Sequence, residues 1–210
     1  MLSLFFTAMA LATVFNAAPG PVFAETVRQG LRGGWRAALA VQFGSLAGDA
    51  LWALLGLAGV GLVLRLEVLR LPVALAGIAY LLWLAWDAWH EAVLDRPPSP
   101  VAPSQAALRS GVMLSVTNPQ NIAYWAALGS AMGAVGVVAP TPQHYVVFFA
   151  AFMTASFVWS FVAAGLAHVM VGGASGGWAR LINRVIAVVF VLLACGAAHA
   201  TWQQFGALAG

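Results

Sequence analysis

The chain has 210 residues, of which 62% are hydrophobic and only 7% are charged. Soluble domains carry roughly a quarter of charged residues, so this composition excludes an ordinary soluble protein and indicates an all-α integral membrane protein. The net charge of +3 comes from nine arginines against six acidic residues, with no lysine. Because the arginines are dispersed between apolar segments, we assign the basicity to membrane topology and expect no nucleic-acid partner.

Six apolar segments are each long enough to cross the hydrocarbon core of a bilayer, which takes about 20 helical residues. Between the third and the fourth lies a linker, about 92–109, whose prolines disfavour a helix. We expect one membrane domain, 1–210, built from two three-helix repeats over about 1–91 and about 110–205. The six predicted transmembrane helices are 2–26, 38–64, 68–89, 111–134, 145–170 and 181–203.

Arginines are distributed unevenly between the loops on the two sides of the membrane. Because cytoplasmic loops carry an excess of basic residues, we expect the linker in the cytoplasm and both termini in the extracytoplasmic space. The arginines on the predicted cytoplasmic side are Arg28, Arg32, Arg36, Arg96, Arg109, Arg180 and Arg184, and those on the opposite side are Arg65 and Arg70.

Two proline motifs interrupt the first and fourth predicted helices, with Pro19 and Pro119 100 residues apart. A proline lacks an N–H and crowds the carbonyl group four residues earlier, so Phe15, Ala17 and Ser115 risk losing their helical hydrogen bonds. Since lipid offers no replacement partners, the protein itself must satisfy these groups. Paired breaks in two halves are typical of transporter sites made from discontinuous helices, and a simple kink is the alternative.

The two breaks offer polar groups to a ligand. N–H groups at the restart of each helix suit a carboxylate, and carbonyl groups before each break can hold a cation or an ammonium group. Nearby side chains can add hydrogen bonds. The candidate substrate-binding residues at the breaks are Asn16, Pro19, Gly20, Pro21, Thr117, Asn118, Pro119 and Asn121.

Asp49 is the only acidic residue in the long apolar run 37–64. A carboxylate at bilayer depth costs about 2.5–3.5 kcal/mol, so its presence suggests a function. Arg36 is 13 residues away, about 20 Å along a helix, and cannot pair with it from there. We therefore expect Asp49 to face a substrate ammonium group or to carry a coupling proton. The alternative is a hydrogen-bonded acid that ties helices together.

A stripe of residues at four-residue spacing runs beside Asp49 and consists of Gly44, Gly48, Trp52 and Gly56. Small residues on one stripe let helices approach closely, so the stripe predicts packing, either within the chain or in a homodimer. Trp52 joins the candidate substrate-binding residues because it lies next to the acid.

The two halves of the chain also resemble each other weakly. Residues 48–52 align with 155–159, and residues 77–80 align with 187–190. Because a repeat with three helices enters the membrane from the opposite side in its second copy, we expect inverted repeats whose proline breaks face each other.

The other polar residues favour plainer interpretations. Glu25, Arg28 and Gln29 have helical spacing and are expected to form a surface pairing. The acidic cluster at the end of the third helix is expected to lie in a solvated interface, with a metal site as the less favoured alternative. No phosphate-binding loop, Cys-x-x-Cys pair or nucleophile elbow is present, so we expect no enzyme activity, cofactor or metal site. The cluster is Asp87, His90, Glu91 and Asp95.

In combination, these motifs resemble the LysE/RhtB family of amino-acid exporters over nearly the whole chain. The resemblance implies a six-helix inner-membrane protein that exports amino acids or close derivatives and is coupled to the proton gradient. One departure is Gln120, since the family usually has lysine there, and the second break therefore lacks a cation for a carboxylate. The motifs are Pro19-Gly20-Pro21, Gly30, Gly34, Gly44-x-x-x-Gly48-Asp49, Gly77-Ile78-Ala79-Tyr80-Leu81 and Asn118-Pro119.

Residues 23–26 and 42–49 also resemble a subgroup labelled as chemotactic transduction proteins. Three hypotheses follow. The first is an amino-acid exporter that works by alternating access, the second is a divalent-metal exporter, and the third is a membrane-embedded sensory or regulatory subunit linked to chemotaxis-type signalling.

Overall fold

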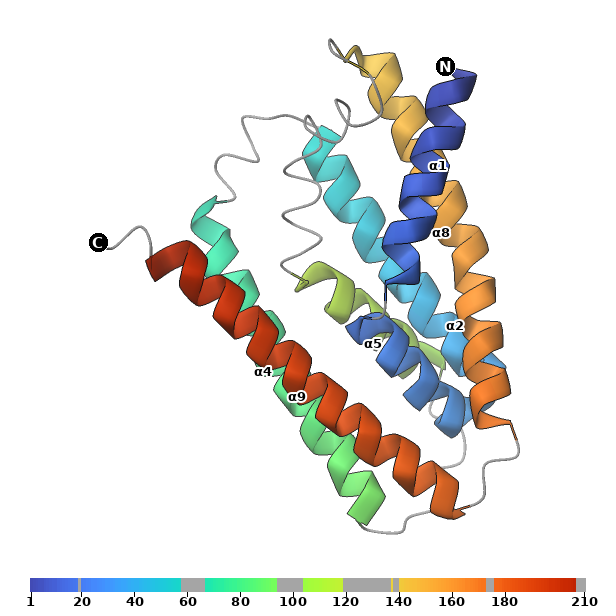
Figure 1. Ribbon diagram of the computed structural model, residues 1–210, viewed down its shortest axis with the longest axis vertical. Helices are drawn as coiled ribbons and strands as arrows, with labels where there is room; N and C mark the ends of the chain where they lie inside the picture. The colour runs from blue at the N-terminus through green and yellow to red at the C-terminus, as the bar shows by residue number, and fades with distance from the viewer. Residues whose placement is uncertain are drawn as a thin grey trace.

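The computed structural model describes residues 1–18, 20–57, 67–93, 104–118, 137, 140–172 and 176–206. Every regular element in these residues is an α-helix, which confirms the predicted all-α class. The helices in Figure 1 are α1 (Leu2–Ala17), α2 (Pro21–Leu57), α4 (Glu67–Val93), α5 (Ser104–Val116), α8 (Pro142–Val171) and α9 (Gly176–Gly206).

Four of the described helices contain an apolar segment long enough to cross a membrane, and α1 is a shorter apolar helix. Large apolar side chains also cover the outside of the bundle, among them Leu82, Trp86 and Val188, each of which is about half exposed or more. An apolar exterior of this kind matches lipid and not water. The chain is therefore a multi-pass membrane protein, with candidate spans at Pro21–Leu55, Leu71–Val93, Pro142–Val171 and Gly176–Gln203.

The first predicted helix is interrupted at its proline motif, as expected. The backbone is extended at Ala18 (φ −63°, ψ 125°), and α2 begins at Pro21. The carbonyl of Phe15 keeps a partner, because the Ala18 N–H donates to it at 3.3 Å. A 3₁₀-type bond from the residue three positions later thus replaces the α-helical bond that Pro19, which has no N–H, cannot donate. The Ala24 N–H then donates to the Gly20 carbonyl at 3.1 Å and starts the next helix.

Helix α2 is a hairpin of two arms that meet at Gly34. Gly34 has φ 65° and ψ −160°, a conformation that glycine adopts without strain. The side chains of Thr26 and Gln42 are joined by a 2.8 Å hydrogen bond, although 16 residues of straight helix would separate them by about 24 Å. The chain therefore reverses direction between the first arm (21–33) and the second arm (35–57), as Figure 1 shows in two shades of blue.

The helices pack in a few strongly preferred pairs. The second arm lies against α5 and α8, α1 lies against α8, and α4 lies against α9 (Figure 1). One apolar cluster joins the first arm to α4, α8 and α9 around Leu84, Ala167 and Phe190. A second joins α1, the second arm and α8 around Trp52 and Phe152.

Several predicted boundaries are wrong. The predicted first helix, 2–26, ends too early, because its part after the proline break continues to the Gly34 turn. Part of the predicted linker, 92–109, is helical, because α5 begins at Ser104 and has no proline after that point. The fourth predicted helix is observed up to Val116, and residues 119–134 of it lie outside the described residues. The division into two repeats stays a prediction.

Candidate functional site

Asp49 lies on the second arm and faces the interior of the bundle. Its side chain is buried, and its Oδ1 accepts a 2.7 Å hydrogen bond from the Ser115 hydroxyl of α5. Ser115 lies four residues before Pro119, at the carbonyl that the second proline disturbs. That carbonyl accepts the Asn118 N–H at 3.4 Å, the same substitution of partners as at the first break. The acid is therefore joined directly to the end of α5, next to the predicted second break.

Glycines bring the second arm and α5 into backbone contact. A Cβ placed on Gly48 would lie 2.6 Å from the Ser115 Cβ, and one on Gly44 would lie 2.8 Å from the Val112 nitrogen. From the α5 side, a Cβ on Gly111 would lie 2.8 Å from the Val41 carbonyl carbon. No side chain fits at these positions, which confirms close packing at Gly44 and Gly48. We call this contact the glycine seam.

The end of α5 receives two further contacts next to Asp49. The indole N–H of Trp52 donates to the Val116 carbonyl at 3.2 Å, one turn along the second arm from the acid. Thr117 is buried against α4, where a Cβ on Gly77 would lie 3.3 Å from its carbonyl carbon. Trp52 and Thr117 thus lie in the same layer of the bundle as Asp49. Their spacing in sequence alone did not establish this.

Asn16 reaches the same region from the first break. Its Nδ2 donates to the Ser156 hydroxyl of α8 at 2.9 Å. The neighbouring Ala155 packs in one apolar cluster with Ala12 and Trp52. Trp52 therefore contacts α1 and α8 through this apolar cluster and α5 through its indole N–H.

For the other predicted site residues the structure gives a position in the chain or no description. Gly20 and Pro21 form the start of the first arm. Asn118 ends the described part of the fourth membrane segment. The substrate-binding role of the whole set stays a prediction, and the residues outside the described part of the chain are Pro19, Pro119, Gln120 and Asn121.

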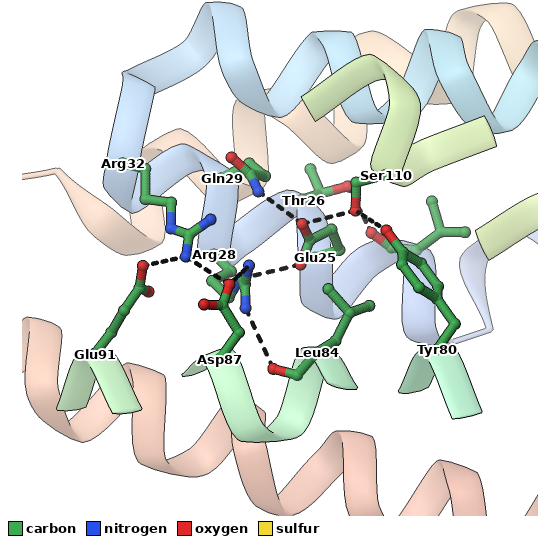
Figure 2. A network of polar contacts seen from close by, with 11 residues as sticks. Glu25, Thr26, Arg28, Gln29, Arg32, Tyr80, Leu84, Asp87, Glu91 and Ser110 are labelled. Carbon is green, nitrogen blue, oxygen red and sulfur yellow. Dashed lines mark hydrogen bonds and ion pairs between the residues drawn. The ribbon is translucent and has the colours of Figure 1, made fainter. Parts of the chain in front are cut away.

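A second polar cluster lies on the first arm, and its burial contradicts the predicted surface pairing. The side chains of Glu25 and Arg28 are 0% and 1% exposed, and Gln29 is also buried. One oxygen of Glu25 accepts hydrogen bonds from Gln29 Nε2 at 2.7 Å and from the Ser110 hydroxyl at 2.8 Å. Its other oxygen lies 3.1 Å from the Arg28 Nε. Figure 2 shows this carboxylate enclosed by donors from the first arm and α5.

The cluster continues to α4 as a chain of alternating charges (Figure 2). Arg28 donates to the Leu84 carbonyl at 3.2 Å and to Asp87 Oδ2 at 2.8 Å. Arg32 donates to the same Asp87 oxygen at 2.9 Å and also pairs with Glu91. Asp87 and Glu91 are partly exposed, so the chain runs from a fully buried acid to the edge of the bundle. We call this set the charged latch: Glu25, Arg28, Asp87, Arg32 and Glu91.

A sequence signal for the charged latch did exist. Arg28 and Arg32 are four residues apart, and Asp87 and Glu91 are four residues apart, so each pair lies on one face of its helix. Two complementary pairs at the same spacing indicate two helices side by side. The prediction considered Glu25 only with its neighbours in sequence and therefore did not detect the matching spacing on α4.

Hydrogen bonds tie the charged latch to the rest of the bundle. Tyr80 of α4 donates to Ser110 at 3.2 Å, and Ser110 in turn donates to Glu25. Gln42 of the second arm donates to Thr26 at 2.8 Å. No group of three or more histidine, cysteine, aspartate or glutamate side chains in the described residues could hold a metal ion. The described part of the chain therefore gives no support to a metal site.

Comparisons with known proteins agree with this architecture. The profile of the family described as "LysE type translocator" matches residues 13–201. The chemotactic transduction protein ChpE of Pseudomonas aeruginosa is 42% identical over 86% of this chain and 90% of its own length. The uncharacterized membrane protein YahN of Escherichia coli is 29% identical over 87% of this chain and 82% of its own length. No solved structure is significantly similar to the chain.

Proposed function

The chain belongs to the LysE type translocator family, and we propose that it is a secondary transporter that exports an amino acid or a close derivative. The observation that carries the proposal is the buried layer where Asp49 meets the end of α5 through Ser115, next to the predicted second break. A carboxylate kept at membrane depth and joined to a broken helix is the arrangement that transporters use to bind small polar substrates. Its predicted setting is the plasma (inner) membrane.

The substrate we propose is a zwitterion held between the two breaks. The N–H groups at the start of the first arm, next to Pro21, would face its carboxylate, and Asp49 would face its ammonium group. Trp52 and Asn16 approach the same layer from two other sides and would contact the rest of the molecule. The protonation of Asp49 would couple export to the proton gradient, because a buried carboxylate can take up and release a proton as its surroundings change.

We propose alternating access between two inverted repeats, and the packing pattern supports it. Exchanging the halves pairs α1 with α5, the second arm with α8, and α4 with α9. Under this exchange the contact of the second arm with α5 becomes the contact of α8 with α1, which is also present. The contacts of α4 with α9 and of the second arm with α8 map onto themselves. An inverted repeat predicts this pattern.

Hydrogen bonds around the breaks follow the same exchange. Asp49 and Ser156 occupy aligned positions in the weak sequence repeat. Asp49 bonds Ser115, four residues before one proline, and Ser156 bonds Asn16, three residues before the other. The correspondence supports two related half-sites in which an acid has been kept on one side only.

Export is tested by measuring amino acids in the culture medium of a deletion strain, with and without the gene expressed. Accumulation of at least one amino acid on expression, lost with Asp49→Asn, is the expected result. His199→Ala is a matched control, because His199 is exposed on α9 and bonds only towards Gln203 among the contacts seen there. Unchanged export by Asp49→Asn would reject this acid as the coupling or binding residue. An unchanged medium for all strains would reject the exporter.

A signalling role is the second candidate, because the 42% identical relative bears the name of a chemotactic transduction protein. In that case the buried layer would bind an amino acid and pass the signal to a partner without net transport. Flux through purified protein in liposomes separates the two functions. Binding of an amino acid without any flux, together with a chemotaxis defect in the deletion strain, would favour the signalling role.

A further inference from the structure

We propose that the first arm is the moving gate of this transporter and that Glu25, Arg28 and Asp87 are its gating residues, an inference that rests on the proposed transport function. The arm is a helical unit bounded by two interruptions of the helical backbone. On one side the backbone is extended at Ala18, and on the other Gly34 has φ 65°. Rotation at these two places moves the arm without bending a helix.

The arm packs into the main apolar cluster through side chains such as Val27 and Leu31, and its polar contacts are of a kind that can be broken and remade. Towards α4 they are the ion pairs of Arg28 and Arg32 with Asp87 and Glu91, and towards α5 there is the bond from Ser110 to Glu25. Charged groups that separate can be hydrated, whereas the glycine seam is close-packed, is reinforced by the bonds of Asp49 with Ser115 and of Trp52 with Val116, and resists sliding. The second arm is therefore the fixed part, and the first arm is the part that moves.

The charged latch also has a direction. Asp87 and Glu91 lie at the partly exposed end, and Glu25 lies at the fully buried end. Release of Arg28 and Arg32 from Asp87 would let water enter from the edge of the bundle and reach Ser110. The sequence predicts that this edge lies on the cytoplasmic side, in which case the gate would admit substrate from the cytoplasm.

A reversible disulfide tests whether the arm must move. A Cβ on Gly30 of the first arm would lie 3.9 Å from the Ala167 Cβ of α8, within the range of about 3.5–4.5 Å that a disulfide needs. Cys195 is the only cysteine, so the pair Gly30→Cys and Ala167→Cys is built on Cys195→Ala. Oxidation should abolish export, and reduction should restore it. Each single cysteine variant should export normally under oxidation. Full export by the oxidised, cross-linked protein would overturn the gate.

A second measurement needs no transport. Ser110 is buried at the contact of α5 with the first arm, so in a Cys195→Ala background Ser110→Cys should react slowly with N-ethylmaleimide. Asp87→Asn removes the charge shared by both arginines and should raise the alkylation rate about tenfold, the usual weight of a charge-assisted hydrogen bond. His90→Ala is the control, because His90 is exposed and stacks on Trp86. An alkylation rate that Asp87→Asn leaves unchanged would refute the gating role.

The two proposals can fail separately. If Asp87→Asn raises the alkylation rate of Ser110→Cys as expected but no amino acid is exported by the reduced protein, the arm moves and the transport function is wrong. If amino acids are exported while oxidation and Asp87→Asn have no effect, the transport function stands and the gate lies elsewhere.

Discussion

The two arms of α2 are joined at Gly34, yet different forces hold them in the bundle. The second arm packs through the glycine seam, where Gly44 and Gly48 leave no room for a side chain against α5. The first arm is held through charges, with Arg28 inserted between Glu25 and Asp87. It also contributes Ala24 and Val27 to the main apolar cluster, and Val22, Phe23 and Leu31 pack against that cluster.

The difference shows how one element can serve two mechanical purposes. A seam of close backbone contacts has one well-packed arrangement, and a shift of even a fraction of an ångström creates clashes or voids. Ion pairs and hydrogen bonds tolerate a change of partner, because water or a substrate can take the place of the lost group. Whether an arm is fixed or can move therefore depends on the residues that face the neighbouring helix, glycine or charged, and less on the position of the arm along the chain.

The largest expected effect comes from removing the central cation of the charged latch. Arg28→Met should destabilise the purified protein by about 3–5 kcal/mol, because Glu25 is then buried without its charge partner. Thermal unfolding in detergent measures the change. Adding Glu25→Gln should recover part of the loss, since the unpaired charge is removed.

The control for this variant is Arg180→Met on α9. Arg180 is exposed and donates to the Gly176 carbonyl of its own helix, so its replacement should change stability by less than about 1 kcal/mol. An equal loss of stability for Arg28→Met and Arg180→Met would mean that the burial of Glu25 and Arg28 does not raise the cost of removing the arginine.

A smaller loss is expected from filling the glycine seam. Gly111→Val places a branched side chain against the Val41 backbone and should cost about 1–3 kcal/mol through overpacking. Gly165→Ala is the matched control, because a Cβ on Gly165 meets no atom within 4 Å. Alanine is the better helix former, so this control should be neutral or slightly stabilising. If Gly111→Val unfolds at the wild-type temperature, the seam is looser than described.

The sequence allowed the helical class and the proline break in the first helix to be predicted, because both depend on local properties. The composition indicates lipid-facing helices, and a proline acts on the carbonyl four residues earlier wherever it occurs. Asp49, which lies beside the glycine stripe in the sequence, is buried in the structure.

The charged latch could not be found from neighbours in sequence. Glu25, Arg28 and Gln29 match an exposed helical pairing equally well, and their burial depends on α4, which is nearly sixty residues away along the chain. The reversal at Gly34 was missed because a single glycine between helical segments is compatible with a loop, a kink or a hairpin. The conformation of Gly34 and the contacts of Thr26 with Gln42 and of Gly30 with Ala38 establish the hairpin.

The smallest expected effect concerns the hydrogen bond that joins the two arms. A double-mutant cycle with Thr26→Val and Gln42→Leu should give a coupling energy of about 0.6 kcal/mol, the average for such bonds between membrane helices. If the first arm moves as a unit, the bond must break in the open state. The coupling should then fall towards zero in the Asp87→Asn background, where the arm is released. A coupling that keeps its full size there would mean that both arms move together and that Gly34 is a fixed corner.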